Sequence, residues 1–321
     1  MIRKGTGYDA NGNVTQKIGW PNLTTTYAYD ALNRVASKSY SDSTPAVTYS
    51  YDQDRRLTGD SNPNYPLGHL TGVANAVSTT VYNRFDAAGR AAVSTQTTGG
   101  QNYTFGYSYD LSGALLAETF PSGRLLTDTY DAAGREASIT GTKTGETAKP
   151  YVQAVTYAPH GAMQNVQLGN GLWENALFNS RLQSSWLGLG TSNTDTSVAR
   201  FDFQYNLDQS GNCAGTGTNN NGSVTCQTIT APGAAAFTQT YGYDAVNRLA
   251  SAAEGSAWSR NWQYDQYGNG WLTAYTGIGI IPNLTPTSGS NYQASTNMLN
   301  LASFTYLPSG EVLAANGVNY T

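Results

Sequence analysis

Aspartates that directly follow an aromatic residue are the carboxylates most open to chemistry in this sequence of 321 residues. They head short units such as YDAAGR, and two carboxylates about 5–9.5 Å apart could act as the acid and base of a glycosidase. Each Asp, however, holds the same place in its unit, and Asp at the first position of a four-residue turn is a strong turn former. The pattern therefore favours a structural role in turns over catalysis.

The sequence offers few other residues or motifs that could support catalysis. His69 and His160 lie in turn-like contexts, and neither has a nucleophile at a recognised spacing. The motifs G-x-S-x-G, H-E-x-x-H, the P-loop and G-x-G-x-x-G do not occur. The stretch DANGN from Asp9 faintly resembles a calcium loop, but it lacks the alternating acidic ligands and the terminal Glu. We expect no catalytic residue, cofactor or metal site, and the protein is not expected to be an enzyme.

The aromatic–Asp unit is an internal repeat that opens eight times. Its spacing is 21 residues from Tyr8 to Tyr29, 22 residues from Tyr29 to Tyr51 and 21 residues from Tyr243 to Tyr264. Such recurrence is typical of a repeat architecture. The predicted structural motif residues are Tyr8, Asp9, Gly12; Tyr29, Asp30, Asn33; Tyr51, Asp52; Phe85, Asp86, Gly89; Tyr109, Asp110, Gly113; Tyr130, Asp131, Gly134; Tyr243, Asp244, Asn247; and Tyr264, Asp265, Gly268.

Each unit predicts a tight turn. In FDAAGR, Asp86 takes position i, and Gly89 at i+3 adopts a positive φ after a type I turn and re-enters the next strand through a bulge. Asn33 and Asn247 replace Gly at this position, where Asn is the best alternative. Arg55 replaces it in YDQDRR, so we expect that turn to be strained or differently shaped. TFPSG, YAPHG and YLPSG predict a second class of turn, with Pro at i+1 and Gly at i+3.

The segments that enter these turns alternate with period two, as half-buried β-strands do. Phe105, Tyr107 and Tyr109 share one face of such a segment, and Phe201, Phe203 and Tyr205 share another. A period of 21 residues holds two strands of roughly 7–8 residues and two turns, which is one β-hairpin. No convincing amphipathic helix is found. The prediction is an all-β chain of stacked antiparallel hairpins that form a curved or spiralling sheet.

Composition excludes several classes of protein. Lys and Arg number 17 against 21 Asp and Glu, only 12% of residues are charged, and the net charge is −4. A nucleic-acid binder would carry a clustered basic surplus. No run of 18 apolar residues predicts a membrane span, and the opening residues lack the apolar stretch of a secretory signal. We therefore expect no nucleic-acid partner and no membrane span.

The repeat map gives the domain organisation. Residues 1–321 form one predicted repeat region, interrupted by loop-like insertions at 206–236 and 277–297. The first insertion carries Cys213 and Cys226, which could close a disulfide in an oxidising compartment or remain two free thiols. Stability should be distributed over the interfaces between neighbouring hairpins.

The units YDAAGR, YDALNR and YDAVNR, the FPSGR unit from Phe120 and the stretch NGLWENALFNSRLQ resemble the YD repeats of the Rhs family. That family includes bacterial Rhs and wall-associated polymorphic toxins, the TcB/TcC toxin components and the teneurins. The resemblance covers nearly the whole chain. It implies a hollow β-shell in which the tyrosine–aspartate pairs are structural, and it transfers no catalytic residue.

What the resemblance implies about function differs among its members. In the toxins the shell encloses a C-terminal toxic polypeptide, so the leading expectation is a structural part of a secreted bacterial polymorphic toxin, with the rest of a longer chain and an enclosed polypeptide as partners. The family's Asp-Pro-x-Gly signature is absent, and self-cleavage is not assigned. The runner-up is a bacterial cell-surface protein that binds a protein or glycan partner. Exposed aromatics would favour it, and the candidates outside the Tyr ladders are Trp20, Trp173, Trp186, Trp258 and Trp271.

Overall fold

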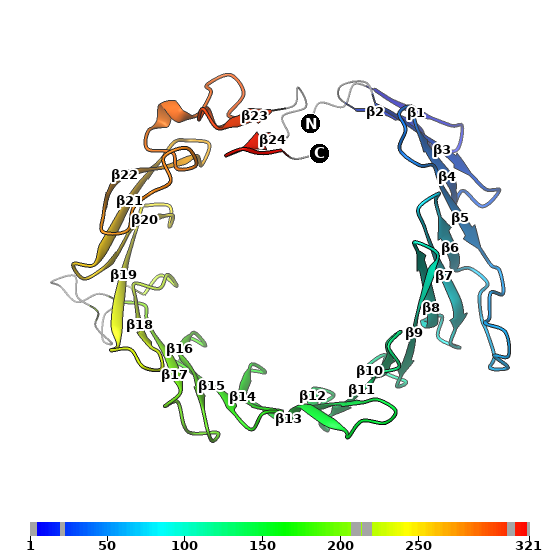
Figure 1. Ribbon diagram of the computed structural model, residues 1–321, viewed down its shortest axis with the longest axis horizontal. Helices are drawn as coiled ribbons and strands as arrows, with labels where there is room; N and C mark the ends of the chain where they lie inside the picture. Colours follow the sequence, from blue (N-terminus) through cyan, green and yellow to red (C-terminus); the bar gives the residue numbers. More distant parts are fainter. Residues whose placement is uncertain (1–4, 20–22, 207–212, 214–219, 307–311, 320–321) are drawn as a thin grey trace. The chain divides into compact units, whose positions relative to one another are not determined.

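The computed structural model describes residues 5–19, 23–206, 213, 220–306 and 312–319. Contacts divide the chain into two compact units, residues 1–151 and 152–321. Strands make up both units (Figure 1), and the one helical element in the described ranges is a turn of 3₁₀ helix, η1 (Gly289–Asn291). No helix in this part of the chain has the length and hydropathy of a membrane span. The predicted absence of amphipathic helices therefore holds for the described residues.

The first unit is a run of antiparallel strands, each hydrogen-bonded to the next in chain order. Tight turns join most of the neighbours, which is why the order in the sheet follows the order in the sequence. The strands are β1 (Gly5–Tyr8), β2 (Val14–Ile18), β3 (Thr24–Tyr29), β4 (Val35–Tyr40), β5 (Val47–Tyr51), β6 (Leu70–Ala74), β7 (Ser78–Phe85), β8 (Ala91–Thr98), β9 (Gln101–Tyr109), β10 (Leu115–Thr119), β11 (Leu125–Tyr130) and β12 (Glu136–Thr142).

The second unit continues the pattern with a sheet of successive antiparallel neighbours and a separate small sheet. The larger sheet holds β13 (Lys149–Tyr157), β14 (Met163–Leu168), β15 (Trp173–Phe178), β16 (Ser184–Gly190), β17 (Ala199–Gln204), β18 (Cys226–Thr230), β19 (Phe237–Tyr243), β20 (Leu249–Glu254), β21 (Trp258–Tyr264) and β22 (Gly270–Thr276). The small sheet holds β23 (Phe304–Tyr306), β24 (Val312–Ala315) and β25 (Val318–Asn319).

Few apolar side chains of the described residues are fully buried. Phe85 and Leu272 are the largest of them, and most others are alanines. Most aromatic side chains of the strands are instead half-buried against their neighbours, as the period-two pattern predicts. Cohesion in each unit thus comes from contacts between adjacent hairpins rather than from a deep core.

The insertions differ in part from the sequence prediction. Residues 226–230, predicted as loop, form β18, which pairs with β17 and β19. The prediction of a loop over residues 226–230 is wrong. The segment CQTIT has residues that suit a strand, and it pairs with the free edges of β17 and β19. Residues 277–297 contain no strand and one turn of 3₁₀ helix. The prediction of a single repeat region over 1–321 stays a prediction.

Candidate functional site

The YD turn is a self-contained hydrogen-bonded unit, seen clearly at Asp86. The Gly89 N–H donates to the Asp86 carbonyl at 3.0 Å, and Gly89 has a φ of +77°. The Asp86 carboxylate accepts from the backbone N–H groups of Ala88 and Arg90, both at 2.9 Å, and from Nε of Arg90 at 2.8 Å. A register shift between Arg84 and Phe85 marks the bulge. The predicted turn geometry is confirmed.

The same bonds recur in the other YD turns, except the one at Asp52, and lower the pKa of their aspartates. A hydrogen bond from the Arg34 backbone N–H holds the pKa of Asp30 below its ordinary value, and the Arg135 guanidinium does the same for the pKa of Asp131. Each carboxylate thus stays ionised and spends both oxygens on its own turn. Asn33 and Asn247 take a φ of +60° and +61° where Gly stands elsewhere, as the sequence predicts.

The turn that carries Arg55 is differently shaped, as expected. Asp52 itself adopts a φ of +63°, and its N–H donates to the carbonyl of His69 instead of a residue four positions on. Gly68, with a φ of +84°, takes the place of the missing glycine and donates its N–H to the Asp52 carboxylate at 2.6 Å. The chain between these residues therefore forms a long excursion inserted into one YD turn.

Tyrosine hydroxyls connect each YD turn to the turn before it. The Tyr130 hydroxyl donates to the Leu115 carbonyl at 2.7 Å, and Tyr264 donates to the Leu249 carbonyl at 2.8 Å. In each case the acceptor is the residue that opens the strand after the preceding turn. The same bond is made by Tyr29, Tyr51, Tyr109, Tyr205 and Tyr292, whereas Tyr243 donates to the carbonyl of Val224, two residues before β18 begins.

An arginine at the sixth position of the unit supplies a second connection, which the sequence analysis missed. The Arg90 guanidinium binds its own Asp86, lies 4.7 Å from the centre of the next Tyr109 ring and donates to the Asp110 carbonyl at 2.8 Å. Arg248 repeats this arrangement with Tyr264 and the Asp265 carbonyl, whereas Arg34 lies over the Tyr51 ring and pairs with the Asp52 carboxylate at 2.8 Å. The recurrence of Arg after Gly or Asn in YDAAGR, YDALNR and YDAVNR was the signal that could have revealed it. We call these tyrosine and arginine contacts together the YD ladder.

The two histidines lie at the two units in which phenylalanine replaces the tyrosine of the YD ladder. His69 stacks on Phe85 with ring centroids 4.7 Å apart, and His160 meets Phe178 edge-on at 4.7 Å. Both phenylalanines occupy the tyrosine position of a unit and lack the hydroxyl. A ring contact therefore replaces the hydrogen bond at these steps. The predicted role of both histidines as turn residues agrees with this placement.

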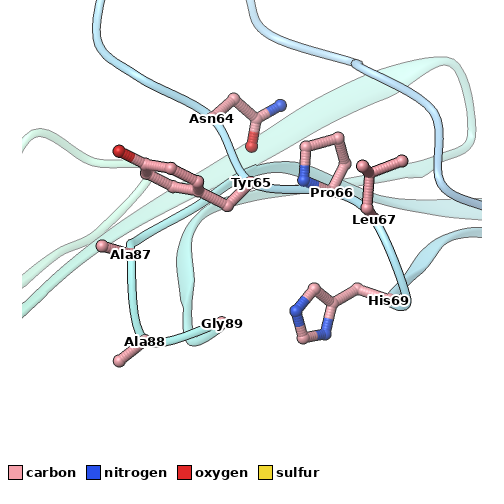
Figure 2. Close-up of a pocket in the computed structure, with 8 residues that line it drawn as sticks. All are labelled: Asn64, Tyr65, Pro66, Leu67, His69, Ala87, Ala88 and Gly89. Carbon is pink, nitrogen blue, oxygen red and sulfur yellow. The ribbon is translucent and has the colours of Figure 1, made fainter.

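A cleft of about 520 Å³ lies between the excursion and the following YD turn (Figure 2). Asn64 anchors the excursion, because its side chain accepts the Phe85 N–H at 2.8 Å. The Tyr65 side chain is 49% exposed at the rim of the cleft. The lining residues are Asn64, Tyr65, Pro66, Leu67, His69, Ala87, Ala88 and Gly89.

The cysteines and tryptophans are placed as follows. Cys213 is joined to Cys226 in a disulfide with the Cα atoms 5.7 Å apart, and Cys226 is almost fully buried. The tryptophans at 173, 186, 258 and 271 are half-buried, whereas Trp20 lies outside the described residues. The turn at 306–310 also falls largely outside them. No three His, Cys, Asp or Glu side chains of the described part gather as metal ligands would.

Comparison with known proteins identifies the fold. No protein-family model and no curated protein matches the sequence. A crystal structure of TcdB2–TccC3 matches with a TM-score of 0.73 and 15% identity, over 98% of this chain and 19% of that one. A TcdB2–TccC3–Cdc42 structure gives 0.70 and 15%, over 96% and 18%. The Photorhabdus luminescens Tc holotoxin pore gives 0.68 and 14%, over 98% and 18%.

These structural neighbours are Tc toxin components of the TcB–TcC type, one of the groups that the YD motifs resemble. The fold prediction, an all-β chain of stacked antiparallel hairpins of the Tc toxin shell type, is confirmed. The chain spans about a fifth of the length of the structures it matches. The fold is what this likeness shows, and the activity and partners of the whole protein are proposals.

Proposed function

We propose that this chain is a non-catalytic wall segment of an encapsulating β-shell in an exported bacterial toxin of the Rhs type. The YD ladder is the observation that carries the proposal, because it bonds most YD turns to the turn before them and so suits a continuous wall. The fold likeness to TcdB2–TccC3 supports the same role. The partners in this proposal are the rest of a longer chain and a polypeptide enclosed by the shell.

The state of the aspartates supports a structural rather than catalytic role. General acid catalysis by a carboxyl group at neutral pH needs a raised pKa, whereas the YD turns lower the pKa of Asp30 and Asp131. Their oxygens are also committed to backbone and guanidinium donors of the same turn. A catalytic role would require breaking the turn that positions the group.

Electron cryomicroscopy of the complete product of the gene tests the proposal. We expect a closed wall in which this chain forms successive hairpins, with density for a further polypeptide inside, and a protease should spare that polypeptide until the wall is opened by denaturant. An open sheet with no enclosed polypeptide would contradict encapsulation. Turnover of a substrate that is lost in variants of one carboxylate pair would contradict the non-catalytic role.

A bacterial cell-surface protein that binds glycans is the second candidate, favoured by the exposed Tyr65 ring beside the cleft in Figure 2. Exposed aromatic rings stack on sugar faces. Glycan-array binding by the purified chain, lost in Tyr65→Ser but kept in Tyr267→Ser, would support this candidate over encapsulation. Tyr267 is a matched control because it is 71% exposed on another turn.

A further inference from the structure

One face of strands β14–β17 carries an apolar hollow that no described residue of the chain covers. Its volume is about 450 Å³, and it lies wholly within the second unit. Leu187 and Phe201 at its centre are 41% and 39% exposed, and Met163 at its margin is 48% exposed. Large apolar side chains gathered on one exposed face mark a binding surface more often than single exposed residues do.

Strand register explains why these side chains gather. Leu187 lies opposite both Ala176 and Phe201 on the neighbouring strands, so the three side chains form one row across the sheet. A second row contains Glu174 opposite Leu189, and Leu189 opposite Ala199. The hollow is therefore a feature of the sheet face itself and needs no loop to shape it.

The chain covers part of the opposite face of the same strands. Asn175 is 2% exposed there, and its amide donates to the carbonyls of Ser192 at 2.9 Å and Asp195 at 2.7 Å. Gly188 leaves room for the loop, since a Cβ at that position would lie 2.5 Å from Thr196. The loop after β16 thus covers one face at Asn175 and Gly188 and leaves the apolar hollow on the other face open.

Charge indicates what would occupy the hollow. Residues 152–321 contain four arginines, no lysine and eight acidic residues, so they carry the whole net charge of −4 of the chain. Arg200, next to Phe201 in sequence, is held by Asp202 at 2.6 Å and lies 4.8 Å from the Trp186 ring. The exposed Glu174 carboxylate at the hollow makes no ion pair with a described residue. A ligand with apolar groups and a positive charge fits this surface best.

We propose that the hollow on β14–β17 binds an extended polypeptide segment in which apolar side chains flank a lysine or arginine. The apolar side chains would lie on Leu187 and Phe201, and the basic group would pair with Glu174. Four strands span about 14 Å, which is the length of about four extended residues. The inference rests on the proposed function, because an enclosed polypeptide is the partner that such a surface would hold.

Fluorescence anisotropy with labelled peptides of about twelve residues tests the site on the 321-residue protein. One peptide carries Leu, Phe and Lys among Gly, Ser and Thr; a second has Glu for Lys, and a third has Ser for Leu and Phe. We expect the first to bind at least about tenfold more tightly than the other two, which is about 1.4 kcal/mol. Raising the salt to about 0.5 M should narrow the difference between the Lys and Glu peptides, because exposed charges are then screened.

Variants on the two faces of the sheet localise the binding. Leu187→Ser and Phe201→Ser should each raise the Kd about tenfold, and Glu174→Gln should raise it about threefold for the Lys peptide alone. Leu177→Ser is the matched control, because Leu177 is 44% exposed and its side chain points to the opposite face of β15. Circular dichroism confirms that each variant is folded.

Three outcomes would overturn the proposal: no binding by the folded protein up to about 1 mM peptide, equal binding of all three peptides, or an effect of Leu177→Ser equal to that of Phe201→Ser. Each of these outcomes would refute the binding site but would not bear on the proposed shell, which cryomicroscopy of the complete product tests separately. Conversely, a product with no closed wall would refute encapsulation even if the peptide binds.

Discussion

The aspartate and the glycine of a YD turn have different roles in forming the tight turn. Asp131 accepts two backbone N–H groups and its own turn's arginine, while Gly134 takes the positive φ that the return strand requires. The structure shows a further turn in which a residue other than Gly or Asn has this positive φ. Leu182 adopts a φ of +64° in the turn after Phe178, where the other YD turns, except the one that carries Arg55, place Gly or Asn.

Replacing Leu182 with glycine should stabilise the protein. A left-handed conformation costs a residue with a Cβ about 1–2 kcal/mol, and Leu182 is 59% exposed, so little packing is lost. We expect Leu182→Gly to raise the free energy of unfolding by about 0.5–1 kcal/mol in urea titrations, after the entropy of Gly is included. Leu182→Ala is the control and should give no gain, since alanine keeps the Cβ. A gain from both variants would show that φ is not the cause.

Gly89 and Gly134 form a matched pair for a second test. Their φ angles are +77° and +75°, but a Cβ on Gly89 would lie 2.7 Å from the His69 ring, whereas Gly134 has open space. We expect Gly89→Ala to cost about 1 kcal/mol more than Gly134→Ala, because His69 must leave its stack on Phe85. In a His69→Ala background the two variants should cost the same. A difference that persists there would rule out the histidine contact.

Acid should weaken the turns through their aspartates. The pKa values of Asp30 and Asp131 lie below the ordinary value of 3.8, and the Arg56 guanidinium lowers the pKa of Asp54 to about 2. The unfolded chain therefore binds more protons than the folded one, and this stabilisation is complete above the unfolded pKa. We expect the urea midpoint to be flat from pH 7 to about 5 and to fall from about pH 4 to 2. A midpoint that stays level down to pH 2 would contradict this linkage.

At the scale of the strand pair, the YD ladder decides which hairpins hold together. Tyrosine hydroxyls reach from most units to the preceding one, and the guanidinium groups of Arg34, Arg90 and Arg248 reach to the following one. Two steps use a histidine–phenylalanine contact instead. These contacts lie on the turn side of the hairpins, next to the bulges that re-aim the strands. Adjacent hairpins are thus held together both by backbone hydrogen bonds between their strands and by the side-chain contacts of the YD ladder.

Removing one hydroxyl measures a step of the YD ladder. Tyr130→Phe loses the 2.7 Å bond to the Leu115 carbonyl, which should cost about 1 kcal/mol of unfolding free energy. Tyr107→Phe is the control, because no hydrogen bond of its hydroxyl is found within the described residues. Both residues are half-buried tyrosines of strands. Equal costs would show that the hydroxyl bond adds nothing to the interface.

At the scale of the whole molecule, stability is distributed along the chain rather than concentrated in one core. Each strand contacts its sequence neighbours, and a repeat array of this kind opens by regions. The disulfide between Cys213 and Cys226 is the one covalent link beyond the backbone, since the sequence holds only these two cysteines. It ties the insertion to β18 in the second unit.

The substitution Cys213→Ser should therefore destabilise the second unit and leave the first unit unchanged. Loss of a link that closes a loop of this size costs about 3 kcal/mol, and the buried Cys226 stays in place. We expect hydrogen exchange measured by mass spectrometry to rise in β17, β18 and β19 and to stay unchanged in residues 23–142. Faster exchange in both units would contradict a local role. Reducing the wild-type protein should reproduce the pattern of the variant.

The sequence by itself determined the all-β class, the hairpin period, the YD turns with Asn33 and Asn247 in the glycine role, and the altered turn at Arg55. These features are local, because turn chemistry and period-two alternation act over a few residues. Neighbouring repeats also share a sequence, so one readable unit describes many.

Only the tertiary structure decided the rest. It showed the arginine link at Arg90, the strand at Cys226–Thr230, that Cys213 and Cys226 form a disulfide rather than two free thiols, and the apolar hollow around Phe201. Each depends on which segment lies beside which, and strand register is set by pairing across the sheet rather than by either strand alone. A register shift of one residue would move Leu187 and Phe201 to the opposite face and remove the hollow, which is why the sequence could not show it.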